Sequence, residues 1–275
     1  MRDLKGKRVL VTGAADGIGR GAALAFARQG SRLALVDIDG AKLDSVAVEA
    51  GKLGAECTTY VADVSDAAAV SALAAEVERD FGGLDVLVNV AGVCIVGDIA
   101  DTPLEDWDWI LGVNLLGPIH TIREFLPGMR GRGAGHILNV ASAGGLVPMA
   151  MIGAYCTTKA GLIGLSRSLA QEVFDDGVRV TAFCPGLTRT GIVSRMRFQG
   201  YSREKMLAAG DTMMRGGMSA EKTGERIVLA VMREKSLVVT TNLMKAVALL
   251  MRLSPGLVMF VLTRGKKLNE RLYRP

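Results

Sequence analysis

Short hydrophobic runs alternate with longer amphipathic stretches along most of the chain. The runs are rich in Val, Leu and Ile, and they predict buried strands near 8–12, 33–37, 57–61, 84–90, 136–141, 178–183 and 237–240. The stretches between them predict helices near 17–29, 41–53, 66–81, 104–126, 154–174 and 221–235. Continuous rather than alternating runs indicate strands that are covered on both faces. The pattern therefore predicts an α/β fold, a doubly wound parallel sheet of about seven strands.

Proline and glycine modify this pattern at two places. Gly117-Pro118 falls within the predicted helix at 104–126, and we expect the helix to break near this dipeptide. Residues 242–262 are strongly apolar, and Pro255-Gly256 should divide them into a helical hairpin. Their longest uncharged stretch is 253–263, which is far shorter than the roughly 20 residues that span a bilayer.

Charge is distributed unevenly along the 275 residues. The net charge of +5 could indicate a nucleic-acid partner, but residues 1–241 sum to −1 and residues 242–275 to +6. The C-terminal segment is too apolar, and too poor in aromatic residues, for an arm that follows phosphates, so we expect no nucleic acid. An apolar hairpin with a basic end instead predicts either peripheral contact with a membrane surface or a helix pair packed over the pocket or on a partner subunit.

Cysteine and histidine usage bears on location and on metals. The four cysteines are scattered without a CxxC pair, and the polar first residues run straight into a strand without a signal-peptide region. We therefore expect reduced thiols in a cytoplasmic protein that is at most peripheral to a membrane. His120 and His136 lie in apolar stretches and are expected to be structural, and the shortage of ligands argues against a metal site.

A glycine-rich turn follows the first predicted strand. Three glycines lie between that strand and the next helix, namely Gly13, Gly17 and Gly19. There a pyrophosphate can approach the backbone and the helix N-terminus. Asp37 ends the second strand and can accept hydrogen bonds from both ribose hydroxyls of an adenosine while repelling a 2′-phosphate. No cation follows it directly, since Ile38 and Asp39 come next, and Asp16 adds no positive charge to the turn. The arrangement predicts a Rossmann-like site that prefers NAD to NADP.

Six motifs in order resemble the short-chain dehydrogenase/reductase family over roughly residues 5–241. They are Thr12–Gly19, Asp63-Val64, Asn89-Val90-Ala91-Gly92, Asn114, Ser142 with Tyr155 and Lys159, and Pro185–Thr190. The resemblance implies cofactor contacts at Gly13, Asp16, Gly17, Ile18, Gly19, Asp37, Ile38, Asp63, Val64, Asn89, Val90, Ala91, Gly92, Tyr155, Lys159, Pro185, Gly186, Thr188 and Thr190. Val90 departs from the family, which usually has an Asn there that bonds within the sheet, so we expect less local rigidity.

Four residues are the expected catalytic set: Asn114, Ser142, Tyr155 and Lys159. Tyr155 and Lys159 are four apart in a helix and share a face, so the ammonium should lower the pKa of the phenol and make it a usable general acid or base. Ser142 ends the preceding strand and can hold the substrate oxygen. Asn114 can anchor a water for proton relay. The resemblance implies the same roles and adds that Lys159 binds the nicotinamide ribose.

The substrate is predicted from the residues around this set. Five methionines lie within residues 192–218, where the family carries a substrate-covering loop, and Met149 and Met151 precede Tyr155. They suit a bulky apolar substrate, although core packing explains them equally well. Four arginines near this loop could meet an anionic group, but a solvated surface is the simpler interpretation: Arg189, Arg195, Arg197 and Arg203.

The sequence thus predicts an NAD-dependent oxidoreductase that interconverts a hydrophobic secondary alcohol and its ketone, with a steroid- or lipid-like substrate. Residues 1–241 would form the dinucleotide-binding and catalytic domain, and residues 242–275 a C-terminal helical extension. The alternatives are a 3-oxoacyl thioester reductase of fatty-acid metabolism and a non-catalytic NAD-binding scaffold. The family resemblance also implies a homodimer or homotetramer.

Overall fold

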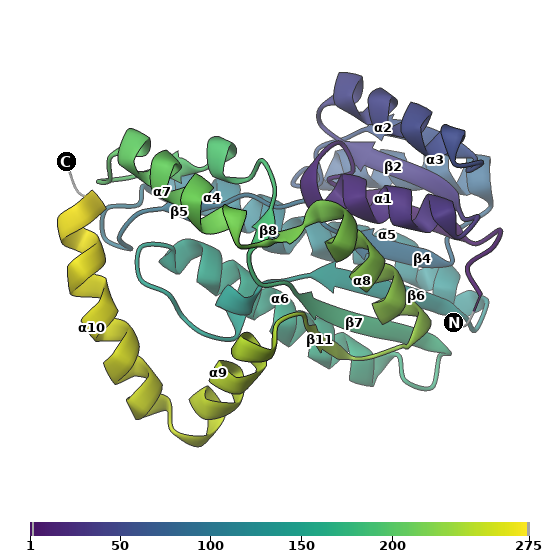
Figure 1. Cartoon of the computed structure of the whole chain (residues 1–275). Coiled ribbons are helices and arrows are strands. Elements are labelled where there is room, and N and C mark those ends of the chain that lie inside the picture. Colours follow the sequence, from purple (N-terminus) through teal and green to yellow (C-terminus); the bar gives the residue numbers. More distant parts are fainter. Residues whose placement is uncertain (2, 274–275) are drawn as a thin grey trace.

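The computed structural model describes residues 1 and 3–273, and for residues 211 and 265–273 it describes the backbone alone. Seven parallel strands form the central sheet in the order β11-β7-β6-β4-β1-β2-β3 (Figure 1). Their bounds are β1 (Arg8–Thr12), β2 (Arg32–Asp37), β3 (Cys57–Val61), β4 (Val86–Asn89), β6 (Gly135–Val140), β7 (Val178–Cys184) and β11 (Leu237–Val239). The predicted doubly wound, Rossmann-like α/β sheet of seven strands is confirmed.

Helices cover both faces of the sheet, as the continuous hydrophobic runs predict. One layer consists of α1 (Gly17–Arg28), α2 (Gly40–Lys52) and α8 (Ala220–Met232). The other consists of α3 (Ala67–Phe81), α5 (Gly117–Gly131) and α6 (Gly153–Glu172). Side chains of one strand alternate between the two cores, so Val9 and Val11 pack with the first layer and Leu10 with the second.

Helices α1 and α8 approach each other closely at two glycines. A Cβ added at Gly224 would overlap the carbonyl oxygen of Gly21, and one added at Gly21 would overlap the carbonyl oxygen of Ala220. The close approach fixes α1, whose N-terminus follows the glycine-rich turn, against the C-terminal part of the sheet domain.

The chain order reverses between β1 and β4, which are neighbours in the sheet although two βα units separate them in sequence. Ligands of doubly wound sheets bind at the carboxyl ends of the strands at such a switch point. Here the hydroxyl of Thr12, at the end of β1, accepts hydrogen bonds from the backbone N–H groups of Val90 and Ala91 at 3.0 and 3.2 Å. The two strand ends are thereby joined where the site is expected.

The long helix predicted at 104–126 is interrupted earlier than Gly117-Pro118. It consists of α4 (Leu104–Leu111), a π-helical turn (Gly112–Leu116) and α5, which begins at Gly117 and continues to Gly131. The interruption expected near Gly117-Pro118 is therefore present, but it is a π-helical turn that ends directly before Gly117. Proline near a helix start needs no N–H donor, so Pro118 begins α5 instead of ending a helix.

Residues 188–219 are more ordered than the loop that the sequence predicts. They contain β8 (Thr188–Arg189), a 3₁₀ turn (Val193–Arg195), β9 (Arg197–Phe198), α7 (Arg203–Arg215) and β10 (Met218–Ser219). Strand β9 pairs with β5 (Ile95–Val96), and β10 pairs with β8. The β8–β10 pair thus holds the two ends of this segment together, and β9 joins its middle to the chain that follows β4.

Two helices follow the last strand of the sheet, α9 (Asn242–Leu253) and α10 (Pro255–Tyr273) (Figure 1). They form a V, and the chain turns at Ser254 directly before Pro255, so the predicted hairpin is confirmed. Within the described part of the chain, neither these helices nor any other is long and apolar enough to cross a membrane.

Candidate active site

The glycine-rich turn lies directly on the loop that follows β4. Gly13 has a φ of +65°, and a Cβ added there would lie 2.8 Å from the Cα of Ala91. A Cβ at Gly19 would overlap the carbonyl oxygen of Gly13. The turn can therefore be built only without side chains at these two positions, and side-chain-free backbone of this kind lets a dinucleotide pyrophosphate approach closely. Ile18 is the second residue of α1 and lies in its first turn, at the helix N-terminus that would face the phosphates.

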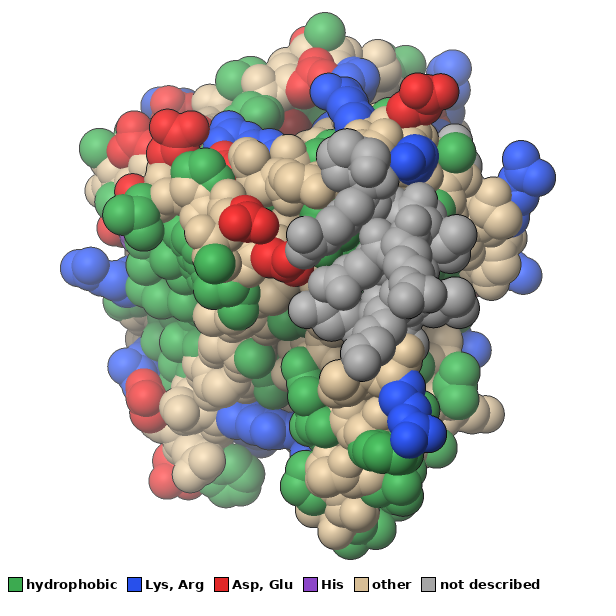
Figure 2. Space-filling model, turned by 90° about the vertical axis from the view of Figure 1, so that its left-hand side faces the viewer, with side chains coloured by type: hydrophobic (Ala, Val, Ile, Leu, Met, Phe, Trp, Pro, Cys, Tyr) green, Lys and Arg blue, Asp and Glu red, His purple; other side chains and the backbone are tan. Residues whose placement is uncertain are grey.

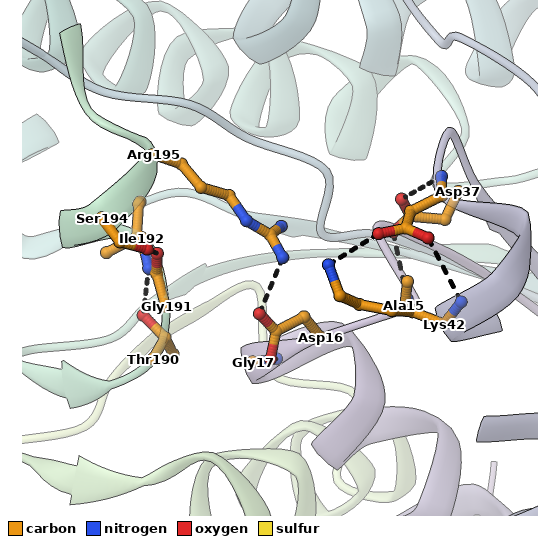
Figure 3. A network of polar contacts seen from close by, with 11 residues as sticks. Ala15, Asp16, Gly17, Asp37, Lys42, Thr190, Gly191, Ile192, Ser194 and Arg195 are labelled. Atoms are coloured by element: carbon orange, nitrogen blue, oxygen red, sulfur yellow. Dashed lines mark hydrogen bonds and ion pairs between the residues drawn. The ribbon is translucent and has the colours of Figure 1, made fainter. Parts of the chain in front are cut away.

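Asp37 joins β2 to the same turn (Figure 3). Its Oδ2 accepts a hydrogen bond from the backbone N–H of Ala15 at 3.0 Å, and its Oδ1 accepts one from that of Asp39 at 3.1 Å. The carboxylate is therefore oriented by the backbone beside the turn. Lys42 pairs with Asp39 rather than with Asp37, at 2.6 Å, and Ile38 is 71% exposed.

Asp16 forms the opposite side of the turn (Figure 3). Its Oδ1 accepts a hydrogen bond from the Gly17 N–H at the start of α1, and its Oδ2 pairs with Arg195 at 2.9 Å. Thr190 lies beside Gly17, where an added Cβ would meet its side chain at 3.1 Å. The segment after β7 thus passes close to the glycine-rich turn, 170 and more residues away in sequence.

The Pro185-Gly186 corner connects this segment to the sheet. The Pro185 carbonyl accepts a hydrogen bond from Ala143 at 3.0 Å, and the Gly186 N–H donates to the Thr240 hydroxyl at 3.0 Å. Thr188 is buried and donates a long hydrogen bond, 3.4 Å, to the carbonyl of Gly186.

The expected adenine region lies after β3. Asp63 Oδ1 accepts hydrogen bonds from the backbone N–H and the hydroxyl of Ser65 at 2.8 and 2.7 Å. Val64 is buried, and its carbonyl oxygen lies 3.0 Å from Nδ1 of His120. His120 is therefore structural, as the sequence predicts.

Asn89, the residue before Val90, is hydrogen-bonded within the core. Its Nδ2 donates to Oδ1 of Asn139 on β6 at 2.9 Å, and its Oδ1 accepts from the hydroxyl of Thr121 at 2.8 Å. Asn139 in turn donates to Ser166 on α6 at 3.0 Å. A buried polar chain therefore ties β4 to β6 and to the helices α5 and α6 behind them, while Val90 packs against the opposite core; the lower rigidity expected at Val90 stays a prediction.

Ser142, Tyr155 and Lys159 meet at the carboxyl ends of β6 and β7. Ser142 follows β6 and forms a hydrogen bond with the Tyr155 side chain. Lys159 is buried one turn farther along α6; its Nζ lies 5.8 Å from the Tyr155 ring centroid and donates to the Val140 carbonyl at 3.0 Å. Hydroxyl, phenol and ammonium thus share one small volume, as the spacing predicts.

The protonation of this group differs from the sequence-based expectation. Burial is the largest cause that raises the pKa of Tyr155 above its ordinary value, the nearby Cys94 thiol adds to it, and the hydrogen bond with Ser142 opposes it. Burial also lowers the pKa of Lys159, to about 8. The expected lowering of the phenol pKa was therefore wrong for the protein alone, because desolvation penalises both charged forms.

Asn114 is fixed by the π-helical turn. Its Oδ1 accepts a hydrogen bond from Val93 N–H at 2.8 Å, and its Nδ2 donates to the Val93 carbonyl at 2.9 Å and to the Thr158 hydroxyl at 3.1 Å. A Cβ added at Gly92 would lie 3.3 Å from Asn114 Oδ1 and 3.4 Å from Lys159 Nζ. The side chain is thus fully bonded and holds the loop after β4 next to Lys159.

A largely apolar hollow of about 410 Å³ opens at Gly153, where α6 begins, two residues before Tyr155. It is lined by residues 97–100 and by Met149, Ala150, Met151 and Gly153. The Met149 methyl lies 3.0 Å, and Ser142 Oγ 3.5 Å, from the place that a Cβ at Gly144 would take, so Met149 reaches from the lining of the hollow toward Ser142. None of the five methionines predicted within 192–218 lines it, and Met213 among them is 53% exposed.

The sequence analysis did not predict the contacts that hold residues 188–219 in place. Arg197 pairs with the buried Asp106 and lies over the Trp109 ring at 3.8 Å, and Gln199 donates to the same carboxylate at 2.7 Å. Together with Arg195, two of the four arginines considered for an anionic substrate are therefore paired within the protein. Partners 91 and 93 residues apart leave no signal in a single sequence.

Comparison with known proteins agrees with this arrangement. Residues 7–199 match the family described as short chain dehydrogenase. The probable oxidoreductase EphD of Mycobacterium tuberculosis is 42% identical over 201 residues, which cover 72% of this chain and 34% of EphD. This chain therefore aligns with a minor part of that longer protein. The D-beta-hydroxybutyrate dehydrogenase of Cupriavidus necator is 41% identical over 195 residues, 70% of this chain and 74% of that protein.

Solved structures extend the likeness to most of the fold. A short-chain dehydrogenase/reductase from Burkholderia phymatum in complex with NAD has a TM-score of 0.86 at 30% identity, and the match covers 94% of this chain and 96% of that one. A metagenomic short-chain oxidoreductase in complex with NADP has a TM-score of 0.73 at 30% identity, over 86% and 97%. Sequence match, sheet order and the Ser142, Tyr155 and Lys159 cluster agree, and the chain belongs to the short-chain dehydrogenase family.

Proposed function

We propose that the chain is an NAD-dependent dehydrogenase that interconverts a hydrophobic secondary alcohol and its ketone. The observation that carries the proposal is the cluster of Ser142, Tyr155 and Lys159 at the sheet's switch-point edge, beside an apolar hollow and opposite the glycine-rich turn. A nicotinamide dinucleotide supplies hydride chemistry when bound there. The chain's own residues bind it, orient the substrate and move one proton.

Tyr155 is the proton donor and acceptor in this proposal. Its raised pKa keeps the phenol protonated near neutral pH, so in ketone reduction Oη gives its proton to the substrate oxygen. Ser142 holds that same oxygen, because its hydroxyl already reaches the phenol. Lys159 stabilises the phenolate that results. In alcohol oxidation the Tyr155 phenolate accepts the proton of the alcohol hydroxyl. The pKa of Tyr155 therefore sets the pH range in which oxidation can proceed.

NAD preference rests on Asp37. Both of its oxygens accept backbone hydrogen bonds, which keep the carboxylate at the end of β2 beside the glycine-rich turn. A 2′-phosphate there would meet a negative charge that is already fixed in place. The nearest lysine along the chain, Lys42, is engaged with Asp39.

An apolar substrate is supported by the hollow beside Ser142. Ile99 and Met149 line it and remain 64% and 41% exposed, so a ligand that covered them would bury apolar surface. Steroid- or lipid-like alcohols fit this chemistry. A 3-oxoacyl thioester is the second candidate, but two of the four arginines that could bind an anionic carrier are paired with acids.

A pure NAD-binding scaffold is disfavoured by the buried lysine. Lys159 is 3% exposed and has no carboxylate partner among the described residues. Burying an unpaired ammonium costs folding free energy, and a protein that only binds NAD would gain nothing in return. Homo-oligomerisation, which the family resemblance implies, stays a prediction.

The test is a screen of steroid, fatty and aromatic secondary alcohols with NAD and with NADP, read by absorbance of the reduced nicotinamide. We expect turnover of apolar alcohols with NAD. Turnover with NADP alone would refute the role of Asp37, and a preference for 3-oxoacyl thioesters would favour the second candidate. Binding of NAD without turnover of any substrate would favour the scaffold.

A further inference from the structure

Exposed apolar side chains are concentrated on α9 and α10. Of the twenty large hydrophobic side chains that are exposed in the described structure, eight fall within residues 243–261. Leu253 is 75% exposed and Phe260 is 55% exposed. Figure 2 shows hydrophobic side chains gathered at the lower end of the molecule, where the two helices meet. A few isolated exposed leucines need no explanation, but a contiguous group marks an interaction site.

Helix α9 is apolar on two different faces. Met244, Val247 and Met251 recur every three or four residues and are half-buried toward the protein. Leu243, Leu250 and Leu253, seven and three residues apart, form a second row beside the first, and they are exposed. A helix that packs only on its own protein needs one apolar face. That packing explains the half-buried row, and the exposed row of leucines has no partner in the described chain.

Positive charge borders the exposed rows. Lys245 and Arg252 are seven residues apart on one side of α9, and both are exposed, as is Arg264 on α10. Within the described residues none of the three pairs with a carboxylate, and the guanidinium of Arg264 lies 4.2 Å from the Phe260 ring centroid. Residues 242–264 contain no Asp or Glu at all.

The charge favours one kind of partner. A second copy of this chain would bring the same cations against these, which costs free energy unless acids intervene. An anionic lipid surface suits both groups of side chains. Its apolar interior can bury the exposed leucines, and its negatively charged headgroups can pair with the cations. Helix α9 is also suited to lie in that interface, since it is about 18 Å long and the hydrocarbon core is about 30 Å thick.

We propose that the α9–α10 pair docks on an anionic bilayer surface. Leu253, Leu257 and Phe260, on either side of the turn at Ser254, enter the headgroup region. Lys245, Arg252 and Arg264 meet the lipid phosphates. The pair lies on the membrane and does not cross it. This proposal is independent of the reaction that the active site performs.

The test is vesicle co-sedimentation of the full chain with phosphatidylcholine vesicles that contain or lack phosphatidylglycerol. We expect binding to the anionic vesicles that declines as salt is added. Replacing Lys245 and Arg252 together by Ala should weaken it about thirtyfold, since each cation near an anionic surface contributes about a fivefold factor.

Phe260→Glu tests the apolar contact, and Phe174→Glu is its matched control. Phe174 is 67% exposed at the end of α6 and also lies beneath an arginine, with Arg179 at 5.7 Å. We expect Phe260→Glu to abolish vesicle binding and Phe174→Glu to leave it unchanged. Equal binding to both kinds of vesicle, or an equal effect of the two substitutions, would overturn the proposal. The proposal would also be overturned if the protein did not bind vesicles but self-associated, and if Phe260→Glu disrupted that self-association.

Discussion

The carboxylate of Asp37 at the end of β2 accepts a hydrogen bond from the backbone N–H of Ala15 at 3.0 Å. One side chain thus both shapes the glycine-rich turn and presents a negative charge where the adenosine ribose of a dinucleotide would lie. If Asp37 sets the coenzyme preference as proposed, that preference and the conformation of the turn are coupled through this contact.

Asp37→Ser should therefore change coenzyme preference. Removing the fixed charge should raise kcat/KM with NADP about tenfold, which corresponds to about 1.4 kcal/mol, and should lower it with NAD. Steady-state kinetics with both coenzymes measure the ratio. Asp44→Ser is the matched control, because Asp44 is an exposed acid on α2 that bonds only to Thr59 among the described residues. If both substitutions changed the NADP-to-NAD ratio of kcat/KM equally, coenzyme preference would depend on net charge alone and not on the position of Asp37.

The contact of α1 with α8 makes a sharp stability prediction. Gly224→Ala places a methyl group onto the Gly21 carbonyl and should cost about 2 kcal/mol or more in free energy of unfolding. Gly164→Ala is the control: this glycine lies in α6 with nothing within 4 Å of the added Cβ, and the substitution should stabilise by about 0.5–1 kcal/mol. Urea denaturation measures both. Equal effects would mean that the helices do not pack so closely.

His136 should make stability depend on pH. Its Nε2 lies 2.9 Å from the Thr181 hydroxyl, which donates its own proton to the Lys235 carbonyl, so Nε2 carries the ring proton. Its buried Nδ1 has no hydrogen-bond partner, and burial lowers the pKa to about 3. The unfolded chain therefore binds a proton that the folded one does not between about pH 6.5 and 3.

The expected result is a loss of stability as the pH falls through that window. The slope that His136 contributes should approach about 1.4 kcal/mol per pH unit, and it should disappear in His136→Gln. Denaturation at a series of pH values measures both proteins. His120→Gln serves as the control, and identical slopes in wild type and His136→Gln would contradict the assignment.

Burial of Tyr155 sets the direction of a second pH dependence. Because its pKa is raised, the phenol holds its proton at neutral pH and must lose it before it can accept one from an alcohol. Initial rates of alcohol oxidation should therefore climb from pH 7 into the alkaline range, while ketone reduction changes little near neutrality. NAD binding, followed separately, should show no such rise. An oxidation rate that is flat with pH would contradict the raised pKa.

Much of this architecture could be predicted because it is local in sequence. The apolar runs predicted all seven strands of the sheet, and the Tyr155 and Lys159 spacing predicted a shared helix face. The glycine spacing predicted the turn at which a Cβ on Gly13 or Gly19 would not fit. The roles of individual site residues and the division of the chain at residue 241 stay predictions.

What the sequence did not predict depends on distant partners. The π-helical turn around Asn114 is held by the backbone of Val93 and by Thr158, neither of which a helix pattern can indicate. The pairing of Arg197 with Asp106 converts an expected surface arginine into a structural one. The pKa of Tyr155 is governed by burial among groups that only the fold assembles.

The account depends most on Tyr155 as the group that moves the proton. Tyr155→Phe keeps the ring and its packing and removes only the hydroxyl. Turnover of the preferred alcohol should fall at least about a hundredfold, the usual share of general acid–base catalysis. The same protein should still bind NADH, followed by fluorescence, with unchanged affinity. Loss of turnover with intact binding is the predicted result, and substantial remaining turnover would contradict the central claim.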